Sequence, residues 1–185
     1  MDAAAQNLTG PEAQASAPGP GDVFLAGLQA GMLGVLWMLA WTGLCAAWLR
    51  RSFWAPENLL ASVFHPDGNI AMDFQAVTVE GLALYLLVYS LLGAGFAVLA
   101  ARQPMRPART LLLAVVAALA WYYFSFHLLW KTVSPSIAFL AAERPAVLGH
   151  VIYGFVVGRF HSYLPRAENH VAEVPAEADS VAPKV

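Results

Sequence analysis

The sequence predicts an all-α, polytopic membrane protein: a bundle of four transmembrane helices with a short interfacial helix between spans one and two. Hydrophobic residues make up 59% of the 185-residue chain and charged residues only 12%, about half the charged share of an ordinary soluble domain. The mean hydropathy is +0.58. The apolar residues also come in separate blocks, each approaching the roughly 20 residues that cross a bilayer.

Four apolar segments define the expected spans. A helix rises about 1.5 Å per residue and must cross about 30 Å of hydrocarbon. The last segment is the weakest, because His150, Arg159 and His161 interrupt it. The expected spans are residues 23–49, 79–101, 110–130 and 146–164.

The segments outside the spans have different compositions. Residues 1–22 and 165–185 are rich in Ala, Pro and polar residues and lack a sustained apolar stripe, so we expect two disordered tails. Residues 1–22 carry no Lys or Arg, which argues against a targeting peptide of the usual kind. The short link QPMRP, residues 103–107, predicts that the second and third spans are antiparallel neighbours.

The stretch SFWAPENLLASVFHPDG, residues 52–68, predicts the interfacial helix. Pro56 suits the first position of a helix, and Glu57 then lies near its positive N-terminal end. Four apolar residues recur at one-turn spacing and predict one apolar face. They are Leu59, Leu60, Val63 and Phe64. We expect a helix over about 56–64 that acts as a lid or an anchor at the membrane surface.

The short loops carry the charges that set orientation. With four spans, both termini lie on one side of the membrane. Six Lys and Arg residues fall on that side and four on the other. This excess favours termini in the cytoplasm, and we expect a multi-pass protein of the bacterial inner membrane.

Ionisable residues gather on the face opposite the termini. Glu80, His127 and His150 lie near the ends of three different spans, and such residues usually face the bundle interior and have a partner. We therefore expect a polar junction of these three, next to Glu57, Asn58 and His65. Its main interpretation is structural, through hydrogen bonds.

A sharper interpretation of the junction is a haem held between His127 and His150, since neutral imidazoles on adjacent helices can ligate iron. No histidine spacing motif supports that interpretation. The sequence therefore predicts no cofactor and no metal ligands.

Small residues predict where helices approach each other. Gly154 and Gly158 form a Gly-x-x-x-Gly pair in the last span, and Gly27 and Gly31 form another in the first. Such pairs let two helix backbones come close together. We expect the two pairs to be mates, either within one chain or between two copies.

The second half of the chain resembles a known family layout. An apolar span ends in FSFHLLW, a Pro-containing loop TVSPSIAFLAAERP follows, and LGHVIYGFVVGRF forms the last span. Over about residues 110–163, this arrangement resembles YagU-type bacterial inner-membrane proteins and related multi-pass proteins. The resemblance implies an inner-membrane location and no established chemistry.

The sequence contains no nucleophile–base set, phosphate-binding loop or metal motif. Its net charge of −2 gives no basic surface for nucleic acid, and Cys45 is the single cysteine. We expect a non-enzymatic accessory or structural membrane component. Its expected partners are the lipid bilayer and either further copies of itself or a larger membrane complex, with no nucleic acid. The alternatives are a small-solute or proton pathway formed by an oligomer, and a redox subunit that binds haem or quinone.

Overall fold

The computed structural model describes residues 18–65, 73–103 and 105–165, and these residues form helices and no β-strand. The all-α prediction is confirmed for this part of the chain. The predicted tails fall mostly outside the described residues, although the first helix begins at Pro20 and so includes the end of the predicted N-terminal tail. The elements are α1 (Pro20–Trp48), α2 (Ala55–Ala61), α3 (Ala76–Ala101), α4 (Pro107–Phe124), the π-helix η1 (Ser125–Leu129), α5 (Trp130–Val133), α6 (Pro135–Leu140), α7 (Glu143–Val157) and the 3₁₀-helix η2 (Phe160–Tyr163).

Three helical stretches are long and apolar enough to cross a membrane: Pro20–Trp48, Ala76–Ala101 and Pro107–Val133. The third stretch joins α4, η1 and α5 into one rod. Large apolar side chains point outward from these helices. Leu87, Leu99 and Leu112, for example, are 60–64% exposed, which suits contact with lipid better than contact with water.

The segment predicted as a fourth span, residues 146–164, is divided between α7 and η2. α7 begins earlier than predicted, at Glu143, and ends at Val157 after 15 residues. At 1.5 Å per residue, it is about 22 Å long, which is less than the hydrocarbon core of a bilayer. α7 does not meet the length criterion that the other three stretches satisfy.

Local chemistry sets the two ends of α1. Pro20 occupies the start of the helix, and the Gly19 backbone N–H donates to the Asp22 carboxylate at 2.9 Å. At the other end, Arg50 has a positive φ of 60° and the Arg51 N–H donates to the Ala46 carbonyl. This left-handed turn satisfies the last carbonyls of α1 and redirects the chain toward α2.

The close contact between α1 and α3 is made by glycines. A Cβ added at Gly93 of α3 would lie 2.6 Å from both the Gly27 carbonyl oxygen and the Gly31 Cα of α1. Ala30, Ala94 and Ala97 fill the rest of this contact and are fully buried. Gly27 and Gly31 therefore lie at a close helix contact, and the helix that they meet is α3.

The second glycine pair packs on a different helix. A Cβ at Gly154 would lie 2.7 Å from the Val115 Cα of α4, and one at Gly158 would lie 2.8 Å from the Leu111 Cα. The expected pairing of this glycine pair with Gly27 and Gly31 is therefore wrong. Each glycine pair is already covered by another helix, α3 for the first pair and α4 for the second, and α1 meets α7 elsewhere, at Gly34 and Tyr153.

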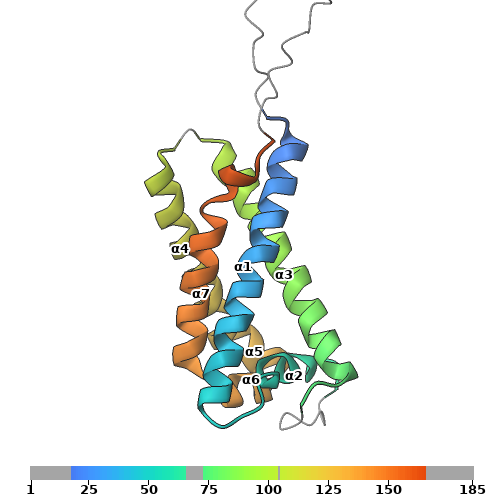
Figure 1. Cartoon of the computed structure of the whole chain (residues 1–185). Helices are drawn as coiled ribbons and strands as arrows, with labels where there is room; N and C mark the ends of the chain where they lie inside the picture. The colour runs from blue at the N-terminus through green and yellow to red at the C-terminus, as the bar shows by residue number, and fades with distance from the viewer. Residues whose placement is uncertain (1–17, 66–72, 104, 166–185) are drawn as a thin grey trace, which may run out of the picture. The chain divides into compact units, whose positions relative to one another are not determined.

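The second and third spans run antiparallel, as the short link predicts, but they are not each other's main packing partners (Figure 1). α3 packs on α1, and α4 packs on α7, so α1 and α7 form the centre of the bundle (Figure 1). A short link brings only the ends of two helices together. The packing surfaces further along then decide the partners.

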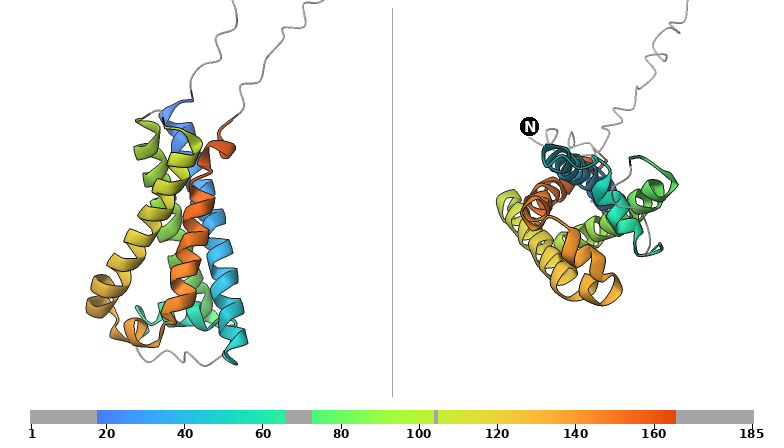
Figure 2. Two further views of the ribbon diagram at one scale, coloured as in Figure 1. Left: turned by 90° about the vertical axis from the view of Figure 1, so that its left-hand side faces the viewer. Right: turned by 90° about the horizontal axis from the view of Figure 1, so that it is seen from below.

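Short helices close one end of the bundle, and we call α2 and α6, together with α5 at the end of the third long stretch, the end cap (Figures 1 and 2). α2 forms close to the predicted place, but its burial differs from that of an amphipathic surface helix. Glu57 and Asn58 are as buried as Leu59 and Leu60, whereas Phe64 follows the helix and is 56% exposed. The polar face of α2 is thus covered by protein.

Hydroxyl groups join α2 to α6 within the end cap. Ser62 lies 3.1 Å from Ser134 and 3.2 Å from Ser136, and it donates to the Leu59 carbonyl. Ile137 of α6 packs with Leu59 and Leu60 beside these serines. Polar and apolar contacts therefore hold the two short helices together.

Candidate functional site

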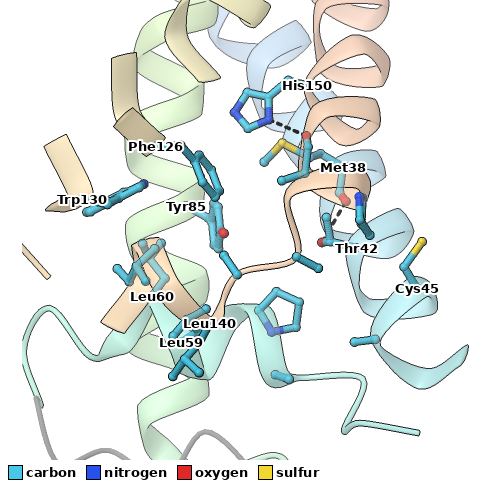
Figure 3. Close-up of a pocket in the computed structure, with 18 of the residues that line it drawn as sticks. Met38, Thr42, Cys45, Leu59, Leu60, Tyr85, Phe126, Trp130, Leu140 and His150 are labelled. Atoms are coloured by element: carbon cyan, nitrogen blue, oxygen red, sulfur yellow. Dashed lines mark hydrogen bonds between the residues drawn. The ribbon is translucent and has the colours of Figure 1, made fainter. Parts of the chain in front are cut away.

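A cavity of about 180 Å³ lies between the end cap and the long helices. In Figure 3, side chains from α1, α2, α3, η1, α5, α6 and α7 converge on it. The labelled lining residues are Met38, Thr42, Cys45, Leu59, Leu60, Tyr85, Phe126, Trp130, Leu140 and His150. We call this space the end cavity.

The end cavity is mainly aliphatic and aromatic. Its volume is slightly larger than that of a cavity of about 150 Å³ that stays dry and takes up a benzene-sized molecule. A single ring or one segment of an alkyl chain therefore fits, and a larger ligand would extend out of it. Pockets of this composition generally bind through shape, with a few polar groups fixing orientation.

His150 and Tyr89 form the polar pair of the cavity wall. His150 is 3% exposed, and its Nδ1 lies 2.7 Å from the Ala146 carbonyl oxygen. A carbonyl only accepts, so Nδ1 carries the proton, and neutral imidazole then accepts at Nε2. The Tyr89 hydroxyl donates to Nε2 at 2.7 Å. Both ring nitrogens of His150 are therefore satisfied within the protein.

Aromatic rings surround His150. The centroids of Tyr89, Tyr122 and Phe126 lie 5.6, 5.2 and 6.4 Å from the imidazole centroid. Phe126 belongs to the π-helix η1, and its ring packs on Tyr122 at 4.7 Å. The extra residue of a π-turn changes which side chains face inward, and such turns are frequent at functional sites.

Two further hydroxyl groups line the cavity. Thr42 donates to carbonyls of its own helix, at Met38 and Leu39. The Tyr85 hydroxyl forms no hydrogen bond to another described residue. Tyr85 therefore retains hydrogen-bonding capacity for water or a ligand.

Arg51 is the charged residue of the cavity lining. It follows the left-handed turn at Arg50, and its guanidinium donates to the Leu140 carbonyl at 3.4 Å. The side chain is otherwise exposed. It places a positive charge where α1 meets α6.

Trp41 fixes the start of α7 against α1. Its indole N–H donates to the Pro145 carbonyl at 3.1 Å. Pro145 and the neighbouring Ala146 also line the cavity. This bond holds one wall of the end cavity in place.

The structure distributes the predicted polar junction over several places. Glu80 pairs with His65 at 2.8 Å, and both side chains are more than 40% exposed. His150 pairs with Tyr89 as described above. His127 stacks on Tyr123, with ring centroids 4.2 Å apart and planes 9° from parallel. In the described residues, Glu80, His127 and His150 thus have three different partners.

Glu57 and Asn58 lie where α2 crosses α3. The Thr78 hydroxyl of α3 donates to the side-chain Oδ1 of Asn58 at 2.5 Å and accepts from the Gln75 backbone N–H at 2.9 Å. Glu57 is 1% exposed, and its Oε2 has no hydrogen-bond partner in the described part of the chain. Burial raises the pKa of the Glu57 carboxyl from 4.5 to about 7.

Gly81 permits this crossing. A Cβ at Gly81 would collide with the Glu57 carbonyl, so the backbones of α2 and α3 touch at this point. Tyr85, one turn further along α3, lies within electrostatic range of the Glu57 carboxylate. The buried acid is therefore close to the cavity wall without being part of it.

The arrangement bears on the haem hypothesis. His150 uses both nitrogens inside the protein, so ligation of iron would require loss of its bond to Tyr89. His127 has a buried Nδ1 without a partner among the described residues, and the Tyr122 ring lies beside both imidazoles. No cluster of three or more metal-binding side chains occurs in the described ranges.

Sequence reasoning missed Tyr85 and Tyr89. Their spacing of four residues places both on one face of the second span, which was a usable signal. The partner of His150 is a phenol hydroxyl, and not the Glu80 carboxyl or the His127 imidazole.

Comparison of the chain with protein-family models, curated proteins and solved structures gives no match. The resemblance to YagU-type proteins stays a prediction.

Proposed function

We propose that the chain is a non-enzymatic, four-span membrane protein that binds the apolar part of a membrane-soluble amphiphile in its end cavity. The end cavity is the observation that carries this proposal. It is lined by apolar side chains from α1, α2, α3, α7 and the α4–α6 region. The His150 nitrogens and the Thr42 hydroxyl already form hydrogen bonds within the protein, so these groups are not free to act in catalysis. This favours a binding role for the cavity.

The assignment of α7 as the fourth span rests on its packing. It lies between α1 and α4, both long enough to cross a membrane. Its small residues Gly154 and Gly158 meet α4 directly, as in membrane helix pairs. A central helix covered by neighbours tolerates a shorter apolar length than a lipid-exposed one.

Four spans place both termini on one side, and the excess of Lys and Arg favours the cytoplasm. The proposed location of the protein is the bacterial inner membrane. Reporters fused to the two ends test the topology. Equal cytoplasmic signals support four spans, and signals on opposite sides contradict them.

Ligand binding is tested with 10-bromodecan-1-ol and protein in phosphatidylcholine nanodiscs. Bromine quenches nearby indoles, and Trp121 and Trp130 line the cavity. We expect saturable quenching in the natural chain. Ala141→Phe places a large ring in the cavity lining and should weaken saturable binding about tenfold, because apolar contact area is lost.

The matched control is Ala47→Phe, the same change at an exposed position of α1 outside the cavity lining. It should bind like the natural chain. Quenching that never saturates, or that both variants reduce equally, would show partition into lipid and reject the proposal.

A further inference from the structure

We infer that the ligand of the end cavity is an amphiphilic anion, whose acidic headgroup binds Arg51 while its alkyl chain enters the cavity. This inference rests on the proposed function and adds the chemical class of the ligand. It starts from the charge at the cavity wall and from the absence of any other charged side chain in the described lining of the cavity.

Arg51 has capacity for an anion. Its guanidinium makes one long hydrogen bond, 3.4 Å to the Leu140 carbonyl, and no carboxylate of the described residues pairs with it. A guanidinium stays charged at all ordinary pH values and offers a planar fork of donors that matches a carboxylate or a phosphate. An acidic headgroup would complete the hydrogen bonding that the protein leaves open.

The backbone at Arg50 positions this side chain. Its φ of 60° lies in the left-handed region, where glycine is the usual residue at the end of a helix. The turn places Arg51 directly after the last hydrogen bond of α1 and beside α6, where it lines the cavity. A strained non-glycine residue next to a charged cavity residue is typical of a functional turn.

The interior of the cavity favours the chain over the headgroup. His150, Tyr89 and Thr42 use their polar hydrogens in bonds within the protein, so an anion inside would be poorly solvated, at a high cost in free energy. The Tyr85 hydroxyl and the Trp130 indole N–H offer only neutral donors. The volume of about 180 Å³ suits one alkyl segment. The charged end therefore remains at Arg51.

The test compares 10-bromodecanoate with 10-bromodecan-1-ol, which differ only in the headgroup. At pH 8 the acid is ionised, because carboxyl groups titrate near pH 4. Phosphatidylcholine nanodiscs carry no net surface charge that would attract the anion. Arg51→Gln should weaken decanoate binding about tenfold and alcohol binding less than about twofold, because only the charge-assisted bond is lost.

Two variants complete the design. Arg51→Lys keeps the charge without the fork and should retain part of the preference for the acid. Arg102→Gln removes a positive charge at the end of α3, outside the cavity lining, and should leave both affinities unchanged.

Each outcome decides a different claim. Loss of acid binding in Arg51→Gln, with alcohol binding kept, supports the inference and also shows that the variant is folded. Equal changes for acid and alcohol, no change for either, or the same loss in Arg102→Gln would overturn it. The proposed function survives such a result if alcohol binding still saturates and still responds to Ala141→Phe.

Discussion

The α1–α3 contact and the end cavity are built on opposite principles. At the contact, Gly27, Gly31 and Gly93 bring two backbones so close that no side chain separates them. At the other region, bulky side chains such as Tyr85 and Phe126 surround an empty volume. The glycine contact leaves no room for a ligand between the two backbones, and the end cavity has space for one.

This difference shows how a short chain can be both stable and receptive. Van der Waals contact between small residues holds membrane helices together where the hydrophobic effect does not. The end cap then closes the more open region through α2 and α6, and α2 carries the buried Glu57 carboxyl, whose Oε2 has no hydrogen-bond partner among the described residues. We expect the end cap to respond to ligand and pH, and the glycine contact to respond to neither.

The largest expected effect breaks the glycine contact. Gly93→Val should lower the free energy of unfolding by about 3 kcal/mol or more, because the new side chain meets backbone atoms that cannot move aside. Titration with sodium dodecyl sulfate, followed by circular dichroism, measures it.

The control for this change lies on the same helix. A Cβ at Gly95 meets nothing within 4 Å, so Gly95→Val changes helix propensity by the same amount without a clash. Similar losses in the two variants would mean that close packing at Gly93 does not stabilise the bundle.

The next effect concerns pH and the end cap. The pKa of Glu57 rises from 4.5 to about 7 on folding, so the folded state binds this proton more tightly than the unfolded state. The stabilisation of the folded state by this proton is complete below pH 4.5, decreases between pH 4.5 and 7, and is absent above pH 7. The total is on the order of 3 kcal/mol at most.

Glu57→Gln should remove this part of the pH dependence, because the amide resembles the protonated acid and does not titrate. Unfolding measured from pH 5 to 8 shows the difference. Glu80→Gln is the control at an exposed, His65-paired position. A pH dependence that persists in Glu57→Gln would assign it to another group.

A smaller effect on stability is expected at Tyr89, between the glycine contact and the end cavity. Tyr89→Phe removes the hydroxyl that donates to His150 and leaves a buried nitrogen unsatisfied, which should cost about 1.5 kcal/mol. Tyr123→Phe, at a side chain that is 61% exposed, should cost less than about 0.5 kcal/mol. Equal losses would show that the His150 bond adds nothing to stability.

The sequence predicted the helices better than their partners. Long apolar runs identify α1, α3 and the α4–α5 rod because bilayer thickness sets a minimum length. Glycine spacing also identified contact surfaces at Gly27 and Gly154. It could not select their mates, because Gly27 meets Gly93 only if α3 approaches at one register, which depends on every side chain along both helices.

The site was predicted less completely. His150 was recognised as a buried polar residue that needs a partner, and it has one in Tyr89. The choice of Tyr89 over Glu80 follows from depth along α3, since Glu80 lies at the exposed start of that helix beside His65. The cavity itself arises from side chains of separate elements, and no single segment of sequence contains it.

The most direct test is hydrogen–deuterium exchange in nanodiscs with and without 10-bromodecanoate. We predict slower exchange in α2 and in residues 140–146, which border the end cavity, and unchanged exchange around Gly27, Gly31 and Gly93. Protection spread evenly over the bundle, or protection confined to the glycine contact, would contradict the account.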